Sequence, residues 1–288
     1  LVALTIKYLA RFCTILMMWR KWKVRISSIE NNKTTEQAIL MAQHSKHPPS
    51  SLFRDLGGCT GWSSLAQEVE QPKANFAAHL GTAVHEISET ILKDRIDNLK
   101  VEDYWLGKTM MVEDVEINIK QEHCDWAKFY TDYVNKREKE LEAEKYIERK
   151  VYVTEINQEL YGTADIILVG KDIVEVIDLK TGTWPVSPEN YNPQLSTYAL
   201  GALAEFNIED PKMNVMMTIV QPIAKEPVKS WICSVEDLTN WGFDVLKPVL
   251  DEADSESPVF AYSVEGCRFC PAKSICDEYK KNTEVKND

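Results

Sequence analysis

The stretch YGTADIILVGKDIVEVIDLKTG, residues 161–182, decides the fold of this 288-residue chain. Two short runs rich in β-branched residues, 160–170 and 172–180, flank the sequence VGKD at 169–172. Strand-forming runs on either side of a turn predict a β-hairpin. Each run carries one aspartate, Asp165 in the first and Asp178 in the second. The turn between them therefore places both carboxylates near the same end of two paired strands.

The sequence on either side of this hairpin predicts an α/β fold of the mixed α+β kind. Further β-rich runs lie at 146–156, 214–222 and 229–235. Apolar residues recur at helical spacing over 74–99, 117–145, 189–206 and 235–253. This order predicts a central mixed sheet flanked by helices. We expect one domain over residues 41–288, which includes a C-terminal cysteine motif at 267–276.

Composition narrows the class of protein. A hydrophobic content of 44% with eight Trp supports a sizeable core and excludes a disordered chain. The net charge of −12 argues against a surface that coats nucleic acid broadly, although a local basic groove on an acidic body is compatible with it. Three of the seven Cys cluster near the C-terminus, which predicts a metal site rather than a disulfide scaffold. Thiols used in this way indicate a reducing compartment, so we expect a cytoplasmic protein.

The first forty residues differ from the rest of the chain. They are apolar and basic, with seven Lys or Arg and two acidic residues. Lys7 and Arg11 interrupt an apolar run that is already shorter than the roughly 20 residues a membrane span needs, so we expect no membrane segment. The sequence from Met41 reads like a natural start. We interpret residues 1–40 as an atypical N-terminal extension, translated from upstream sequence, that is not part of the fold.

The aspartates of the hairpin are candidate metal ligands. Two converging carboxylates bind a hard divalent cation such as Mg²⁺ or Mn²⁺. Lys180 projects to the same face of its strand as Asp178, because alternate strand residues share a face. Its ammonium is placed to orient a water or to stabilise charge on a phosphate. The backbone carbonyl of Leu179, and His85 from the helix at 74–99, are further candidate ligands.

Two polar residues of the next helix complete this candidate site. Gln194 and Tyr198 are four residues apart and therefore share one helix face, from which they can bind a phosphate or position Lys180. Each pattern alone also has a structural interpretation, since Asp-x-Lys on a strand is commonly a surface ion pair and a lone His is commonly packed. The functional interpretation is favoured because Asp178 and Lys180 end a strongly apolar strand, where unpaired charges are costly.

Four cysteines form a second candidate site. Cys267, Cys270 and Cys276 have the spacing C-x2-C-x5-C, and Cys59 lies far earlier in the chain. Four thiolates suit either a tetrahedral zinc ion or an iron–sulfur cluster. Zinc fingers usually draw their ligand pairs from nearby residues, so the remote fourth cysteine favours iron over zinc. Such a centre would close a very long loop of the chain.

In combination, these motifs resemble the RecB-like branch of the PD-(D/E)XK nuclease superfamily. That branch carries, in order, a His on an early helix, G-x-x-D, D-x-K and Q-x3-Y. The chain presents His85, Gly162 to Asp165, Asp178 to Lys180, and Gln194 followed by Tyr198. The sequence GTAVHE at 81–86 is similar to the helix motif of phage-associated exonucleases of this branch. The resemblance spans about residues 44–280.

The resemblance implies a restriction-endonuclease-like core and a metal-dependent DNA nuclease, expected to be an exonuclease in phage or prophage recombination, replication or repair. It implies that His85, Asp165, Asp178 and the Leu179 carbonyl bind the metal and that Lys180 is the catalytic lysine. In CRISPR-associated RecB-like nucleases and helicase–nuclease subunits, one cysteine before the core and three after it hold a [4Fe–4S] cluster that joins the N- and C-terminal parts. Zn²⁺ is the alternative occupant of these thiols.

The expected partners are DNA ends or single strands, together with a helicase or recombination protein. A different class of function stays open at this point. The chain is alternatively a non-catalytic DNA-end-binding module, or a scaffold subunit of a helicase–nuclease complex, for which an acidic surface is suited. The presence of Asp165, Asp178 and Lys180 together favours the enzyme, because a decayed site would usually have lost one of them.

Overall fold

A computed structural model describes residues 45–70, 73–93 and 97–284. The predicted extension at 1–40 lies outside the described residues, so the interpretation of that segment stays a prediction. Residues from Lys46 onward form one compact unit. Among the helices of the described ranges, none is long and apolar enough to cross a membrane.

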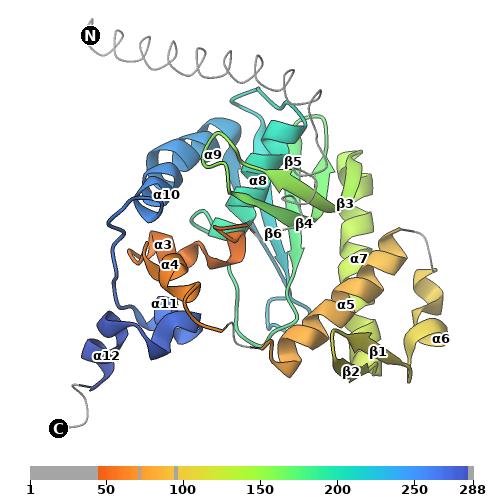
Figure 1. The fold of residues 1–288 in the computed structure, drawn as a ribbon. Coiled ribbons are helices and arrows are strands. Elements are labelled where there is room, and N and C mark those ends of the chain that lie inside the picture. Colours follow the sequence, from red (N-terminus) through yellow and green to blue (C-terminus); the bar gives the residue numbers. More distant parts are fainter. Residues whose placement is uncertain (1–44, 71–72, 94–96, 285–288) are drawn as a thin grey trace, which may run out of the picture. The chain divides into compact units, whose positions relative to one another are not determined.

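A five-stranded mixed sheet forms the centre of this unit (Figure 1). Its strands, in spatial order, are β3 (Glu144–Tyr152), β4 (Tyr161–Val169), β5 (Ile173–Leu179), β6 (Asn214–Val220) and β7 (Val228–Ser234). Neighbouring strands are antiparallel except β5 and β6, which are parallel and joined through helix α8 (Pro193–Glu205). The predicted mixed sheet and the predicted hairpin between β4 and β5 are therefore confirmed.

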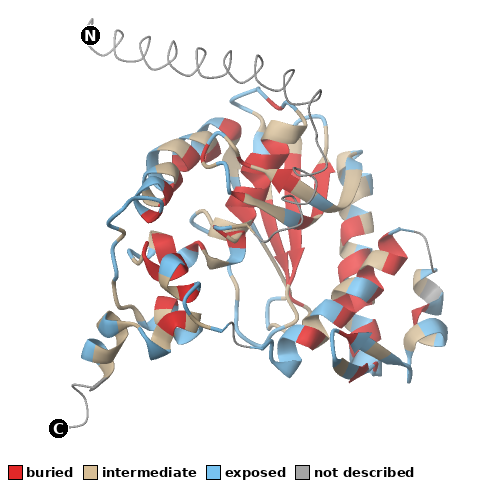
Figure 2. Cartoon of the chain, viewed as in Figure 1, coloured by how far each residue is buried: buried red, intermediate tan, exposed pale blue. Residues whose placement is uncertain are grey.

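Helices cover both faces of the sheet and bury it. One apolar cluster joins the sheet to α8, α9 (Val235–Trp241) and α10 (Lys247–Ala253). A second cluster joins it to α5 (Phe76–Leu92) and α7 (Gln121–Leu141). Figure 2 shows that burial is concentrated in the central strands, above all β5 and β6, and along α8. The near-continuous apolar character of β5 and β6 follows from this covering on both faces.

The shorter elements include a hairpin that the sequence did not predict. Its strands are β1 (Thr109–Val112) and β2 (Val115–Asn118), so α7 begins after residue 117, where the helix was expected to start. The helix expected over 235–253 is interrupted by a π-helical turn, Gly242–Leu246. The remaining α-helices are α3 (Phe53–Leu56), α4 (Trp62–Ala66), α6 (Val101–Trp105), α11 (Val264–Arg268) and α12 (Asp277–Glu284), and the 3₁₀ turns are Pro49–Ser51, Asn98–Lys100 and Pro271–Ser274.

Gly162 allows α8 to approach β4 closely. A Cβ at Gly162 would lie 2.7 Å from Cε1 of Tyr198 and 2.9 Å from Cγ of Pro49. The substitution Gly162→Ala is therefore expected to lower the free energy of unfolding by about 1–3 kcal/mol, because overpacking forces neighbours out of position. Chemical denaturation measures the change. A matched control is Gly182→Ala, since a Cβ there has no heavy atom within 4 Å. Equal stability of the two variants would contradict the packing role of Gly162.

Candidate active site

Three carboxylates lie in one row across β3, β4 and β5. The β3–β4 register places Glu148 opposite Asp165. The β4–β5 ladder ends at the pair Ile166 and Ile177, so that Asp165 and Asp178 are the adjacent residues on the two strands. The structure thus brings the two predicted aspartates together and adds Glu148, which sequence reasoning missed.

The backbone ladder between β4 and β5 ends before this row, and the next contact between these segments involves a side chain. Oδ2 of Asp165 accepts a hydrogen bond from the Leu179 amide at 2.8 Å. Helix α5 places Nδ1 of His85 3.5 Å from the same oxygen and Nε2 of His85 3.1 Å from the Leu179 carbonyl oxygen. Gly81 permits this approach of the helix, because a Cβ at that position would lie 3.1 Å from Oγ1 of Thr181.

Asp178 contacts a second group of polar side chains, next to the contacts made by Asp165. Its Oδ2 lies 2.7 Å from Nζ of Lys180, and its Oδ1 accepts from Nε2 of Gln194 at 3.1 Å. Lys180 also donates to Oε1 of Gln194 at 3.0 Å, and the Gln194 amide lies 3.2 Å from the Tyr198 hydroxyl. Asp178 is only 2% exposed. The four polar residues predicted from β5 and α8, including Lys180 and Tyr198, therefore form one connected network.

Burial shifts the ionisation of the row. The pKa of Asp165 is raised to about 6, mainly by burial and further by Asp178, although His85 opposes the shift. Burial raises the pKa of Glu148 to about 7, with a contribution from Asp165. Burial alone would lower the pKa of Lys180, but the adjacent Asp178 outweighs it and the net shift is upward. Lys180 is therefore positively charged at neutral pH. Its charge stabilises the ionised forms of the neighbouring carboxyls.

His85, Glu148 and Asp165 form a candidate metal centre. One ligand atom from each side chain lies within 4.8 Å of the other two. Adjacent ligands of an octahedral Mg²⁺ ion are about 3 Å apart, because its bonds are about 2.1 Å long. The Leu179 carbonyl oxygen lies at hydrogen-bond distance, 3.1 Å, from Nε2 of His85, so it borders the same group. The donor set of imidazole, carboxylates and carbonyl therefore fits a divalent cation. In this arrangement Asp178 lies beside the group, paired with Lys180.

Glu148 and Tyr130 are the site residues without a clear sequence signal. Glu148 has a backbone φ of +49° in the interior of β3, which a β-strand residue rarely adopts. Strain of this kind persists where the surrounding structure over-determines it, commonly at functional sites. Tyr130 of α7 is fully buried, and its hydroxyl has no hydrogen-bond partner among the described residues. Burial raises the pKa of Tyr130, and the charges of Asp165, Asp178 and Glu148 raise it further. The Tyr130 hydroxyl therefore stays protonated and is a hydrogen-bond donor near the three carboxylates.

The substitution Glu148→Gln is expected to have opposite effects on stability and on metal affinity. The raised pKa of Glu148 means that its ionised form destabilises the folded state, and this penalty appears as pH rises from about 4.5 through about 7. At pH 8 the metal-free variant should be more stable than the wild type by on the order of 2 kcal/mol. Its Mn²⁺ affinity should be lower, because a ligand is lost. Denaturation in EDTA and titration calorimetry measure the two effects. Unchanged Mn²⁺ affinity would exclude Glu148 as a ligand.

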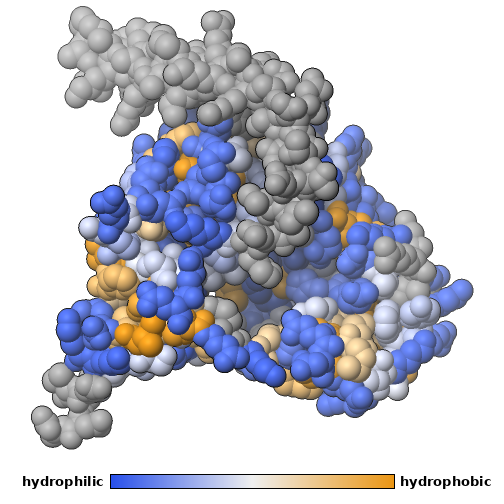
Figure 3. Space-filling model, in the orientation of Figure 1, coloured by the Kyte–Doolittle hydropathy of each residue, from blue (hydrophilic) through white to orange (hydrophobic). Residues whose placement is uncertain are grey.

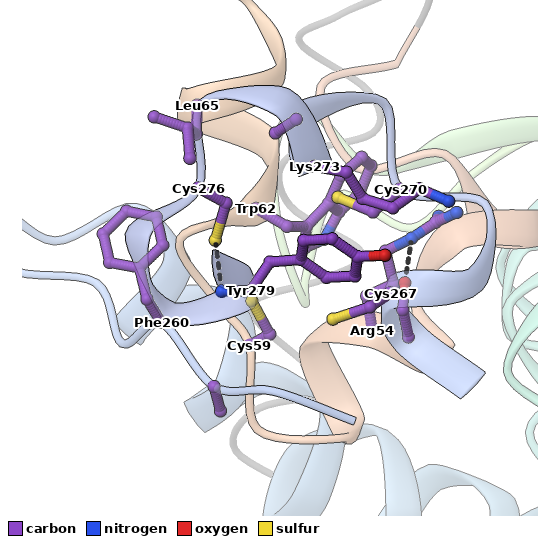
Figure 4. Close-up of a pocket in the computed structure, with 13 residues that line it drawn as sticks. Arg54, Cys59, Trp62, Leu65, Phe260, Cys267, Cys270, Lys273, Cys276 and Tyr279 are labelled. Atoms are coloured by element: carbon purple, nitrogen blue, oxygen red, sulfur yellow. Dashed lines mark hydrogen bonds between the residues drawn. The ribbon is translucent and has the colours of Figure 1, made fainter. Parts of the chain in front are cut away.

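The four predicted cysteines line one pocket (Figure 4). Cys59 follows α3, while Cys267 lies in α11 and Cys270 and Cys276 flank the 3₁₀ turn Pro271–Ser274. The sulfurs face a common space with Phe260 and Tyr279 at its border (Figure 4). Burial raises the pKa of the Cys59 and Cys270 thiols, and the neighbouring cysteines raise it further, although Arg54 opposes the shift at Cys270. Positive charge in the pocket therefore favours the thiolates.

Arg54 lines this pocket and donates hydrogen bonds to the backbone around it. It is 7% exposed and donates from Nε to the carbonyl of Gly266 at 3.1 Å (Figure 4). Its Nη2 donates to the carbonyl of Phe269, also at 3.1 Å. These carbonyls directly precede two of the cysteines. Its guanidinium lies 4.6 Å and 4.8 Å from the ring centres of Phe53 and Trp62. Among the ion pairs of the described residues none includes Arg54, so the buried cation is available to offset charge on the cysteines.

The fold and the two sites define a class: a mixed α/β protein with a candidate divalent-metal centre at the edge of its sheet and a separate four-cysteine pocket. The chain belongs to the DUF2800 family, described as proteins of unknown function, whose family model matches residues 44–288.

Two solved structures are similar to the chain. A candidate exonuclease from Eubacterium rectale has 12% identity and a TM-score of 0.39, over 87% of this chain and 93% of that one. The protein SSO0001 has 12% identity and a TM-score of 0.30, over 76% of this chain and 95% of that one. Likenesses this distant do not assign a function.

Proposed function

We propose that this protein is a DNA nuclease, dependent on Mg²⁺ or Mn²⁺, of the RecB-like, restriction-endonuclease-like kind. The observation that carries the proposal is the grouping of His85, Glu148 and Asp165 within metal-binding distance of one another, directly beside the Asp178–Lys180 pair. Hard cations prefer such oxygen-rich donor sets. A site of this kind next to a buried lysine is the arrangement expected for phosphodiester hydrolysis.

The cation would be held by His85, Glu148, Asp165 and the Leu179 carbonyl, with Asp178 within reach on the adjoining strand. A divalent cation bound there supplies Lewis-acid stabilisation of charge on the scissile phosphate and lowers the pKa of a water. Contacts within the chain help to hold these donors in place. Asp165 accepts from the Leu179 amide, and His85 contacts both Asp165 and the Leu179 carbonyl.

Lys180 acts beside this centre as the catalytic lysine. Its ammonium is held by Asp178 and by Oε1 of Gln194, so it points at a defined place rather than into solvent. A pre-oriented cation stabilises charge that develops on a phosphate without reorganising during the reaction. Gln194 is itself oriented through Asp178 and Tyr198, which makes these residues positioning groups for Lys180.

The four-cysteine pocket is proposed to hold a [4Fe–4S] cluster. Four thiolates suit either a tetrahedral zinc ion or an iron–sulfur cluster. The pocket draws one sulfur from Cys59 and three from residues 267–276, whereas zinc fingers usually draw their ligand pairs from nearby residues, which favours the cluster. Arg54 supplies a buried positive charge beside the pocket. Zn²⁺ stays the alternative, which metal and sulfide analysis distinguishes.

The biological setting proposed for this activity is DNA recombination, replication or repair in a phage or prophage, within a cytoplasm. The substrate would be DNA ends or single strands, attacked as an exonuclease. The net charge of −12 favours a further contact with a helicase or recombination protein, since an acidic surface binds bulk DNA poorly.

The direct test uses the full chain, purified without oxygen, on end-labelled linear DNA and on closed circular DNA. The proposal expects Mn²⁺- or Mg²⁺-dependent cleavage that EDTA abolishes, with linear DNA degraded and circular DNA spared. Cleavage of the circle as well would replace the exonuclease by an endonuclease. Absence of cleavage by folded, metal-loaded protein that still binds DNA would leave a non-catalytic DNA-end-binding module or a scaffold subunit of a helicase–nuclease complex.

A further inference from the structure

An exposed tryptophan follows the candidate catalytic lysine. Trp184 lies in the loop between β5 and α8 and is 68% exposed, although Trp is among the residues that usually bury most of their surface. The guanidinium of Arg268, from α11, lies 4.3 Å from the centre of its indole ring. An aromatic ring and a cation therefore stand together at the surface.

The loop that carries Trp184 is anchored to the sheet. Nε2 of Gln221 donates to the carbonyl of Gly182 at 2.6 Å and to that of Trp184 at 2.8 Å, and Oε1 of Gln221 accepts from the Val186 amide at 3.3 Å. Gln221 is 2% exposed, so these bonds are protected from water. The exposed ring is therefore presented by a backbone that is fixed in place.

This anchor also ties the loop to the end of the strand beside the candidate active site. Val220 pairs with Leu179 in the β5–β6 ladder and its carbonyl accepts from the Lys180 amide at 2.8 Å, so Gln221 lies directly beyond that strand position. The buried side chain of Gln221 thus connects the end of β6 with the loop that presents Trp184. Trp184 follows Lys180 by four residues in the chain, so its loop begins at the candidate active site.

The surface beside the pair is apolar as well as basic. Phe269 directly follows Arg268 and is 72% exposed, and Val264, four residues before Arg268, is 66% exposed. Figure 3 shows a hydrophobic patch over α11 with hydrophilic side chains beside it. This combination suits a single DNA strand, because its bases stack on aromatic rings and its phosphates pair with arginine.

We propose that Trp184 and Arg268 form a binding site for single-stranded DNA, in which the indole stacks on a base and the guanidinium pairs with a phosphate. The inference rests on the proposed nuclease function and names the form of DNA that the site takes. A fully paired duplex suits the surface less, because its bases are already stacked on one another. The site would deliver a strand end to the centre next to Lys180.

Fluorescence anisotropy with labelled oligothymidylate tests the site. The full chain is used in an Asp178→Asn background, so that the DNA is not degraded. Trp184→Ala is expected to weaken binding by roughly 5- to 150-fold, the range measured for loss of one stacked base. Trp184→Phe should retain most of the affinity, and Arg268→Gln should reduce the dependence of binding on salt concentration.

Tyr104→Ala is the matched control. Tyr104 on α6 is 49% exposed and also lies under a cation, with Nζ of Lys108 4.3 Å from its ring centre. Its removal should leave binding unchanged. The inference is overturned if Trp184→Ala binds like Tyr104→Ala, if Trp184→Phe binds as weakly as Trp184→Ala, or if the parent protein does not bind the oligonucleotide. An equal loss on blunt duplex would overturn the assignment to single strands.

The two proposals fail in different ways. Cleavage by the wild type together with normal binding by Trp184→Ala would remove the stacking site and leave the nuclease. Tryptophan-dependent binding without cleavage by the wild type would remove the nuclease and leave a protein that binds single strands.

Discussion

Replacing Lys180 by methionine is expected to reduce metal-dependent DNA cleavage by about 10²–10³-fold, the effect of removing one pre-oriented charge-stabilising group. The ammonium is held 2.7 Å from Asp178 and 3.0 Å from Oε1 of Gln194, so its charge is fixed in place. Methionine is also unbranched and is one heavy atom shorter, so it keeps most of the apolar part of the side chain and loses the charge and the hydrogen bonds. Single-turnover cleavage of end-labelled DNA measures the change, with Mn²⁺ binding measured alongside.

Lys145→Met provides the control for losing an ion pair elsewhere in the sheet. Lys145 on β3 is also largely buried and lies 2.7 Å from a carboxylate oxygen of Glu138. This variant should lose some stability and keep full cleavage. Wild-type cleavage by Lys180→Met, or equal losses in the two lysine variants, would exclude Lys180 as the catalytic lysine.

Replacing Cys270 by serine is expected to prevent binding of the proposed cluster in the cysteine pocket and to lower the free energy of unfolding by several kcal/mol. Cys59 comes from the beginning of the described chain and the other three cysteines from its end, so the centre joins remote segments. When a site forms only in the folded state, metal binding contributes directly to folding. Chemical denaturation of anaerobically purified protein, with iron and sulfide analysis, measures both effects.

Cys233→Ser is the matched control for this substitution. Cys233 is half-buried on β7 and lies outside the cysteine pocket. The control should keep its iron and lose little stability. Identical stability and metal content in the wild type and Cys270→Ser would contradict a structural metal centre.

The approach of Asp165 to Asp178 could be predicted from the sequence, whereas the role of Glu148 could not. Both aspartates flank a hairpin with a recognisable turn, so their spacing alone indicates which end of the strands they share. Glu148 reaches the same row through the β3–β4 register and a left-handed backbone conformation. The register of two strands depends on how they pair in the folded protein. The residues around Glu148 give no sequence signal for a positive φ.

The errors in the helices have a similar cause. Left-handed residues that are neither Gly nor Asn end α7 and form the turn between β1 and β2. Glu142, with φ +47°, terminates α7, where a C-terminal glycine would have been the usual sign. Glu113, with φ +53°, lies in the β1–β2 turn, where the preferred hairpin signals are Asn-Gly and Asp-Gly. The helical periodicity of the neighbouring residues therefore extended the predicted helix, 117–145, into β2 at one end and past Glu142 at the other.

The position of a bound Mn²⁺ ion tests the central claim most directly. Crystals of the full chain grown with Mn²⁺ would be measured at a wavelength where manganese scatters anomalously. The account predicts an anomalous peak in contact with His85, Asp165 and the Leu179 carbonyl, with Glu148 as a further ligand and the Lys180 ammonium alongside. An empty site in crystals that contain Mn²⁺ elsewhere, or a peak that does not contact Asp165, would contradict it.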